Sequence, residues 1–229
     1  MLQNICVYCA SSQRCDAVYH DAARRLGEVL AARGFSVVYG GGAAGSMGAL
    51  ADGALDHGGK VIGIMPKFML DLEWGHPKLT ELHIVEDMRT RKHQMLSQSH
   101  GLVVLPGGCG TLEELFEALT LKRLGLYVHP IVLVNTRNYF APLISLLEHA
   151  VSERFMGPRH LDMWQVVDTP DEVPHALETA PPWSEAARAV SERRRTRARP
   201  PTRAARSRGR AAPRPESRRP ATSRGAEDP

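Results

Sequence analysis

The feature that most restricts how this chain can fold is a regular alternation of short β-prone runs with longer helical segments. Short apolar runs recur at 5–10, 35–39, 61–64, 82–85, 101–105, 131–134 and 164–167. Helical patterns lie between them, at 16–33, 47–57, 87–99, 111–124 and 141–151, and another follows the last run, at 171–179. Strands that alternate with helices of this length predict βαβ units, so we expect an α/β fold with a parallel sheet and helices on both faces. Residues 66–80 have weak periodicity and predict a loop with one short helical turn.

The alternation ends near Ser184, where the composition changes. Residues 184–229 hold 14 arginines against five acidic residues, and apolar side chains larger than Ala nearly vanish. Such a segment buries too little surface to offset its ordering entropy. We therefore expect a single domain over residues 1–183 and a disordered Arg/Pro/Ala-rich tail over 184–229. The remaining 15 basic and 20 acidic residues make the domain mildly acidic, which argues against a core built to hold nucleic acid. Non-specific nucleic-acid binding through the tail stays open, without a stacking platform because no aromatic residue follows Trp183.

Several classes of protein do not fit this sequence. No apolar run approaches the roughly 18–20 residues of a membrane helix, and residues 1–4 carry no basic residue of a secretory signal. We therefore expect a cytoplasmic protein with reduced thiols and no membrane partner. Cys6 and Cys9 form a C-x-x-C, but they lie in a strand-like run without a second pair at zinc spacing. They are interpreted as core residues, and no metal site is expected.

Two glycine clusters, at 40–48 and 106–111, each follow a predicted strand and precede a predicted helix. Glycine lets a ligand approach the backbone, and the N-terminus of the following helix attracts anions. Both clusters should lie at the carboxyl edge of the sheet, where open α/β sheets bind ligands, so we expect a phosphate there. Either cluster alone could instead be a structural turn. Neither matches a P-loop, and the G-x-G-x-x-G at Gly40, Gly42 and Gly45 lacks the acidic residue of a dinucleotide site about 20 residues later.

Acidic and basic side chains adjoin the second cluster. Glu113 and Glu114 fall in the first turn after it, where acids favour the helix dipole but repel a bound phosphate. A carboxylate in that place suits a reaction in which it aligns water or stabilises a developing sugar cation. Arg91 and Lys92 fall in the N-terminal half of another helix, where the dipole gives cations no advantage. Arg91 is therefore expected to bind a carboxylate or phosphate.

Three motifs carry a resemblance to a known family. They are P-G-G-C-G-T-L-E-E at 106–114, M-R-T-R-K at 88–92 and Y-G-G-G-A-A-G-S-M-G at 39–48. These are similar to the P-G-G-x-G-T-x-x-E, M-H-x-R-K and Y-G-G-G-x-x-G-L-M-G motifs of the LOG family, cytokinin riboside 5′-monophosphate phosphoribohydrolases once labelled lysine decarboxylases. The likeness runs from about residue 5 to 173. Arg89 and Ser46 depart from the motifs, and residues 121–123 replace a stretch that often holds Trp and Gln, which puts the base preference in question.

The resemblance implies a Rossmann-like fold, a homodimer, and cleavage of the N-glycosidic bond of adenosine-type 5′-monophosphates, with AMP as a further substrate and no metal or organic cofactor. It implies Arg91 and Glu114 as the catalytic residues. The residues that it implies for substrate binding are Gly41, Gly42, Glu73, Lys92, Gly107, Gly108, Cys109, Gly110, Thr111, Leu112, Glu113 and Thr120.

Two other functions compete with this one. A nucleotide-sensing module would keep the fold and the phosphate loop without turnover, and the presence of both Arg91 and Glu114 argues against it. A pyridoxal-phosphate-dependent decarboxylase needs a Schiff-base lysine and an acid for the pyridinium nitrogen. The chain has only five lysines, of which Lys92 belongs to the R-K motif, so this function is disfavoured.

Overall fold

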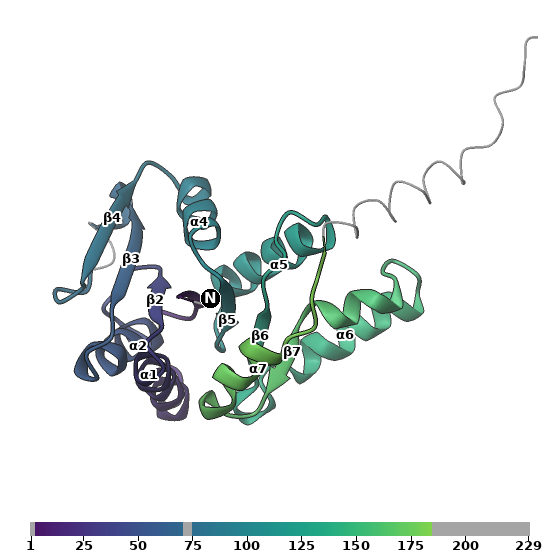
Figure 1. Cartoon of the computed structure of the whole chain (residues 1–229), viewed down its shortest axis with the longest axis horizontal. Helices are drawn as coiled ribbons and strands as arrows, with labels where there is room; N and C mark the ends of the chain where they lie inside the picture. Colours follow the sequence, from purple (N-terminus) through teal and green to yellow (C-terminus); the bar gives the residue numbers. More distant parts are fainter. Residues whose placement is uncertain (1–2, 71–74, 185–229) are drawn as a thin grey trace, which may run out of the picture.

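The sheet confirms the predicted α/β class and its parallel connections. A computed structural model describes residues 3–70 and 75–184, and in it seven strands pair in the order β4-β3-β2-β1-β5-β6-β7, all parallel (Figure 1). The strands are β1 (Asn4–Tyr8), β2 (Ser36–Tyr39), β3 (Val61–Pro66), β4 (Glu81–Val85), β5 (Gly101–Val104), β6 (Ile131–Val134) and β7 (Gln165–Val167). The helices are α1 (Ala17–Ala32), α2 (Gly45–Asp56), α3 (Lys67–Leu70), α4 (Met88–Ser97), α5 (Cys109–Arg123), α6 (Ala141–Ser152) and α7 (Val173–Thr179). Three 3₁₀ turns complete the described chain: η1 (Thr136–Asn138), η2 (Pro158–Met163) and η3 (Pro170–Glu172).

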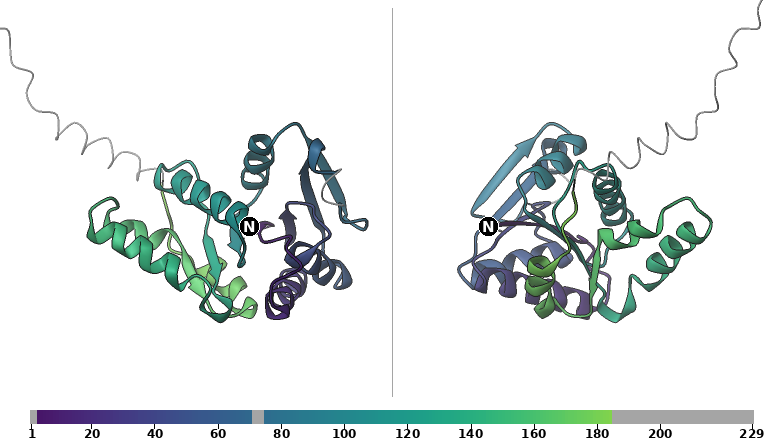
Figure 2. Two further views of the ribbon diagram at one scale, coloured as in Figure 1. Left: turned by 180° about the vertical axis from the view of Figure 1, so that it is seen from behind. Right: turned by 45° about the vertical axis from the view of Figure 1, so that its right-hand side comes forward.

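Helices cover both faces of the sheet, as expected. Alternate residues of a strand point to opposite faces, so Ile5 and Val7 join a core with α1, α2 and α7, whereas Cys6 and Tyr8 join a core with α4 and α5. Figure 2 shows α1 and α2 together on one side of the strands and α4 and α5 on the other. Cys6 and Cys9 are free and fully buried, which confirms them as core residues. Burial raises the pKa of both thiols, so neither is a reactive thiolate.

The order of the strands places a crevice in the sheet. From β1 the chain builds outward through β2, β3 and β4, and after β5 it builds in the opposite direction through β6 and β7. The connections that leave β1 and β5 therefore diverge at the carboxyl edge. Ligands of open α/β sheets bind at such a switch point.

Helix α5 is defined by contacts at both of its ends. It begins at Cys109, two residues before the expected start, because Gly108 already serves as its N-cap. At the far end, the indole N–H of Trp183 donates to the backbone oxygen of Lys122 at 2.7 Å, so the end of the described chain is packed on α5. The predicted disordered tail, beyond Ser184, lies outside the described residues. Within the described part, no helix has the length and apolar character needed to cross a membrane.

Candidate active site

A cleft of about 320 Å³ lies at the switch point between β1 and β5. The loop after β1, the start of α5, and side chains from α2, α3 and α4 line it. Its titratable side chains are those of Cys9, Arg91, Glu113 and Glu114. The cleft therefore unites the motif of α4 with the second glycine cluster.

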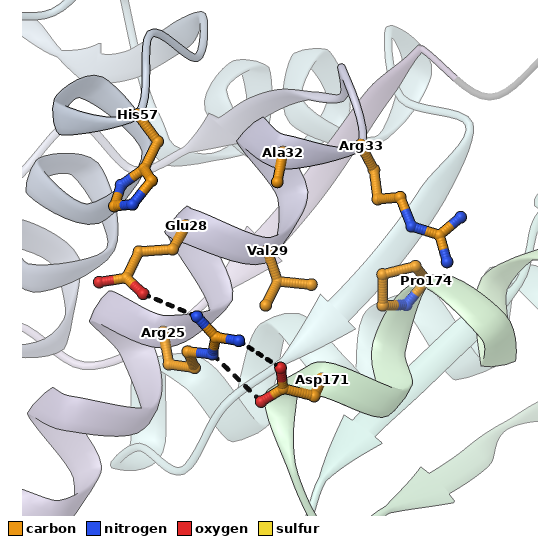
Figure 3. A pocket seen from close by; sticks show the side chains of 8 residues that line it. All are labelled: Arg25, Glu28, Val29, Ala32, Arg33, His57, Asp171 and Pro174. Carbon is orange, nitrogen blue, oxygen red and sulfur yellow. Dashed lines mark hydrogen bonds and ion pairs between the residues drawn. The ribbon is translucent and has the colours of Figure 1, made fainter.

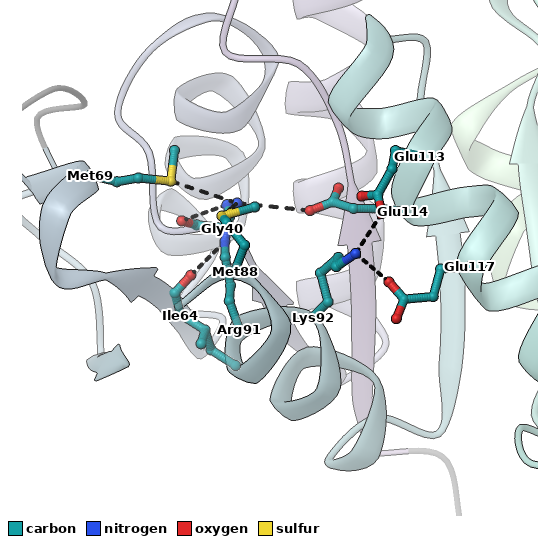
Figure 4. A network of polar contacts seen from close by, with 9 residues as sticks. All are labelled: Gly40, Ile64, Met69, Met88, Arg91, Lys92, Glu113, Glu114 and Glu117. Atoms are coloured by element: carbon teal, nitrogen blue, oxygen red, sulfur yellow. Dashed lines mark hydrogen bonds and ion pairs between the residues drawn. The ribbon is translucent and has the colours of Figure 1, made fainter. Parts of the chain in front are cut away.

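Arg91 is held in this cleft by two backbone carbonyls, one in β3 and one directly after the end of β2. Its Nε donates to the oxygen of Ile64 at 3.0 Å, and its Nη2 donates to the oxygen of Gly40 at 3.1 Å (Figure 4). A Cβ at Gly40 would lie 1.9 Å from Nη2, so glycine leaves room for the guanidinium in this position. The remaining nitrogen, Nη1, lies 3.8 Å from Oε1 of Glu114. The side chains of Arg91 and Glu114 are only 4% and 8% exposed, so this is a buried pair of opposite charges.

The carboxyl of Glu114 titrates near neutrality. Burial raises its pKa to about 7, and the attraction of Arg91 offsets only part of this effect. Glu113 and Glu117 add a smaller repulsion that raises the pKa further. A carboxyl with a pKa near 7 exchanges protons at the pH at which most enzymes work, which is typical of catalytic acids and bases.

Lys92 and Glu113 form a second group of charges beside this pair. The Nζ of Lys92 contacts Glu113 at 2.5 Å and Glu117 at 2.6 Å (Figure 4). These two ion pairs raise the pKa of Lys92 against the opposing effect of burial. They also fix the first turns of α5 against α4. Lys92 is thus tied to α5, and it is not among the residues that line the cleft.

The three glycines around the start of α5 differ in the room that each leaves for a side chain. A Cβ at Gly107 would lie 2.2 Å from the hydroxyl oxygen of Thr111, so the fold itself requires glycine there. At Gly108 and Gly110 a Cβ would meet nothing within 4 Å, and Gly108 has an ordinary φ of −80°. Both residues line the cleft. Neither packing nor backbone conformation explains these two glycines, whereas close approach of a ligand to the backbone does.

The helix N-terminus supplies the donors for such a ligand. Leu112 makes the first helical bond, to the oxygen of Gly108 at 3.0 Å. The N–H groups of Cys109, Gly110 and Thr111 precede it and have no carbonyl one turn back within the helix. With the dipole of α5 behind them, these N–H groups are suited to hold an anion next to Glu114.

The first glycine cluster has a different geometry from the one expected. The oxygen of Gly40 accepts from Arg91, that of Gly41 from the N–H of His76, and that of Gly42 from the Tyr39 hydroxyl. Neither Gly41 nor Gly42 is among the residues that line the cleft. The cluster thus supports Arg91 through the carbonyl group of Gly40, and the substrate contacts of Gly41 and Gly42 stay predictions.

Three further predicted residues do not line the cleft or lie outside the described residues. Thr120 is exposed on α5, and its hydroxyl donates to the oxygen of Phe116 at 2.8 Å within the same helix. Glu73 lies outside the described residues. Leu112 is half-buried and packs against the core on the α5 side of the sheet.

Sequence reasoning missed several residues of the cleft. Ser11 and Ser12 come from the loop after β1, and Met47, Met69 and Met88 come from α2, α3 and α4. The sulfurs of Met88 and Met69 lie 3.7 and 4.0 Å from Nη1 of Arg91. The loop after β1 could have been found from topology, since it faces the loop after β5 across the switch point. The methionines carry no signal in the sequence, because they resemble core residues.

Two other hollows lack this chemistry. One, of about 780 Å³, lies between α4 and α5 and does not include Arg91 or Glu114. The other, of about 370 Å³, lies between α1 and η3 (Figure 3). There Arg25 bonds both carboxylate oxygens of Asp171, at 2.5 and 3.2 Å, and also Glu28. Asp171 and Glu28 neutralise the charge of Arg25, so the contacts in the smaller hollow hold α1 and η3 together.

The fold and the cleft together define the class of the protein. A parallel sheet has a glycine turn and a helix N-terminus at its switch point and buries an Arg–carboxylate pair beside them, which is the arrangement of a Rossmann-like protein. Comparisons with known proteins narrow this class. A family profile described as "Possible lysine decarboxylase" matches residues 47–177.

The curated relatives carry a more specific name. A probable cytokinin riboside 5′-monophosphate phosphoribohydrolase from Oryza sativa subsp. japonica is 38% identical over 80% of this chain and 75% of its own. A cytokinin riboside 5′-monophosphate phosphoribohydrolase from Rhodococcoides fascians is 42% identical over 68% of this chain and 79% of its own. The chain belongs to the LOG family of phosphoribohydrolases.

Solved structures agree on the fold. The molybdenum cofactor carrier protein of Chlamydomonas reinhardtii superposes with a TM-score of 0.61 at 19% identity, over 79% of this chain and 98% of the other. The molybdenum cofactor binding protein of Rippkaea orientalis gives a TM-score of 0.60 at 19% identity, over 78% and 97%. At this identity the likeness extends to the fold alone.

Proposed function

We propose that this protein hydrolyses the N-glycosidic bond of adenosine-type 5′-monophosphates and releases the free base and ribose 5-phosphate. The observation that carries the proposal is the position of the buried Glu114 carboxyl one turn after the unpaired N–H groups that begin α5. A phosphate on those groups brings its sugar toward the carboxylate. The names of the relatives support this reaction over other reactions of nucleotides.

The chemistry follows from the two parts of the site. The phosphate binds the N–H groups of Cys109, Gly110 and Thr111 and fixes the ribose. As the bond from C1′ to the base nitrogen breaks, positive charge develops on the sugar, and the Glu114 carboxylate stabilises it. Water then adds to C1′ and leaves its hydroxyl on the ribose. The water loses one proton and the departing base gains one, so the reaction is balanced. Arg91 keeps Glu114 in place and favours its ionised form.

Three finer features belong to the same proposal. We expect AMP to be hydrolysed as well as N6-modified nucleotides, and the protein to be cytoplasmic, in keeping with four free cysteines among the described residues. A second copy of this chain is the partner that we expect. Phe116, Leu124 and Leu126 are 40%, 46% and 58% exposed near α5, and a homodimer would cover such side chains.

A panel of nucleotides tests the proposed reaction. The purified protein is incubated with AMP and with isopentenyladenosine monophosphate, and the products are separated by chromatography. We expect free base and ribose 5-phosphate in equal amounts. Tight binding of the nucleotide without base release would establish a sensing module instead. A pyridoxal-phosphate-dependent decarboxylase would instead show a visible absorbance band when purified. It would also need a lysine for the Schiff base, and among the described residues no lysine lines the cleft.

Replacing Gly110 by Ala separates ligand binding from folding. Alanine is more favourable than glycine in a helix by up to about 1 kcal/mol, and the added Cβ meets no protein atom, so Gly110→Ala is expected to fold with equal or higher stability. Gly110 lines the cleft, so the added methyl group would crowd a phosphate bound there, and we expect the Kd for AMP to increase about tenfold or more. Thermal unfolding and calorimetric titration measure the two effects.

The matched control is Gly107→Ala. Its Cβ would lie 2.2 Å from the Thr111 hydroxyl, so this variant is expected to lose stability. If the Gly110→Ala variant binds AMP as tightly as the parent chain, the phosphate does not bind at this turn.

A further inference from the structure

The turn after β6 has an unusual backbone. Within η1, Arg137 has φ 54° and ψ 33°, and Asn138 has φ 58°. Two consecutive residues other than glycine in the left-handed region are strained, and such strain persists only where the surroundings fix it. The turn lies at the carboxyl edge of the sheet, next to the strand whose loop forms the anion site.

Hydrogen bonds and an ion pair made by side chains fix this turn. The Asn135 Oδ1 accepts from the N–H of Phe140 at 2.8 Å, and its Nδ2 donates to the Asn138 side chain at 3.3 Å. The guanidinium of Arg137 contacts the carboxylate of Asp16 at 2.6 Å, and Asp16 also caps α1. The strained turn is therefore built into the fold.

The turn delivers the hydroxyl of Tyr139 to the loop before α5. The ring packs edge-on against Phe140 at 5.1 Å and against Tyr19 at 6.1 Å between centroids. Its hydroxyl donates to the backbone oxygen of Gly107 at 2.5 Å. Tyr139 is not among the residues that line the cleft, whereas Gly108 is.

The geometry of a trans peptide turns this contact into a constraint on the anion site. The C=O of Gly107 and the N–H of Gly108 belong to one planar unit and point in opposite directions. With the carbonyl held by Tyr139, the N–H of Gly108 points away from that hydroxyl, and it can face the cleft, which Gly108 lines and Tyr139 does not. A peptide between two glycines rotates easily, because no Cβ restricts it.

We propose that Tyr139 is a positioning residue for phosphate binding: its hydroxyl holds the peptide between Gly107 and Gly108 so that the N–H of Gly108 joins the donors of the anion site. This inference rests on the proposed function for the identity of the ligand, the 5′-phosphate of a nucleotide. The hydrogen bond also polarises the peptide and strengthens that N–H as a donor. The strained turn after β6 thus serves the site without touching the substrate.

The test compares Tyr139→Phe with Tyr19→Phe. Each variant removes one hydroxyl from the same pair of packed rings, but only the first removes the contact with Gly107. For Tyr139→Phe we expect the Kd of ribose 5-phosphate and the KM of AMP to increase about threefold to tenfold, with kcat and the thermal midpoint unchanged. Tyr19→Phe is expected to match the parent chain. Adenosine, which lacks the phosphate, should bind both variants and the parent chain equally.

The outcomes separate this inference from the reaction itself. If the parent chain releases no base but binds ribose 5-phosphate, the proposed function fails and the binding comparison still decides the role of Tyr139. An unchanged Kd in Tyr139→Phe overturns the inference. So does a lower kcat at constant KM, or an equal loss of affinity for adenosine, because either result would show a role apart from the phosphate.

Discussion

Glu114→Gln is expected to lower the rate of base release by about 10²–10³-fold while raising the free energy of unfolding above pH 7. The loss of rate follows from removing the charge that faces C1′. The gain in stability follows from the raised pKa. The folded chain keeps the proton of Glu114 up to about pH 7, whereas the unfolded chain releases it near the ordinary value of 4.5.

The effect of Glu114 on stability depends on pH. The wild-type protein loses stability progressively as the pH rises from about 4.5 through 7, because the buried Glu114 carboxyl resists ionisation. The full loss, on the order of 3 kcal/mol, is present above pH 7. Glutamine does not ionise and avoids this cost. Urea unfolding should therefore show the variant to be more stable at pH 8, and the difference should shrink to about 1 kcal/mol at pH 5.

Rate measurements complete the test of Glu114. If the ionised carboxylate is the active form, kcat/KM of the parent chain rises about tenfold per pH unit below 7 and levels off above it, since kcat/KM reports the free enzyme. Glu148→Gln, an exposed acid on α6, is the matched control and should change neither rate nor stability. If Glu114→Gln releases base at a rate within a few-fold of the parent chain, Glu114 is not a catalytic residue.

The second large effect is expected for Arg91→Met. Methionine fills a similar volume but leaves the carbonyls of Ile64 and Gly40 without their donors and the Glu114 carboxylate without its counter-charge. Breaking a buried pair in this way costs about 3–5 kcal/mol, and urea unfolding should show a loss of this size. Base release should fall about 10²-fold or more, because the pKa of Glu114 rises further without the guanidinium.

A double variant shows whether the two groups act together. In Arg91→Met with Glu114→Gln no carboxylate is left unbalanced, so part of the stability lost in Arg91→Met should return. A coupling energy above about 0.5 kcal/mol establishes the interaction. Arg89→Met is the control, since Arg89 is exposed on the same helix. Additive effects of the two substitutions would contradict a functional pair.

Much of this arrangement could be predicted from the sequence because it is local. Alternating strands and helices have strong periodicities, and the seven strands and their parallel pairing followed from them. The second glycine cluster and Glu114 are close in sequence, so their proximity in space needed only one helix start. The strand order, and with it the opposing loop with Ser11 and Ser12, depends on packing between distant segments.

The remaining features depend on the orientation of backbone groups, which residue types do not record. A glycine-rich stretch predicts a close approach without showing whether its N–H or C=O groups face the partner. The carbonyl of Gly40 accepts from Arg91, whereas Gly108 and Gly110 line the cleft. The contact of Tyr139 with Gly107 joins residues 32 positions apart and has no local signal.

Helix α5 carries both halves of the site on one rigid rod. The donors at its first turn and the carboxylate of Glu114 are separated by about one turn, roughly 5 Å of rise. In the proposed reaction, this fixed spacing sets the distance from phosphorus to the anomeric carbon that a substrate must have. Nucleotides esterified at the 3′ oxygen, or lengthened by a second phosphoryl group, would present the wrong span and place the scissile bond out of reach.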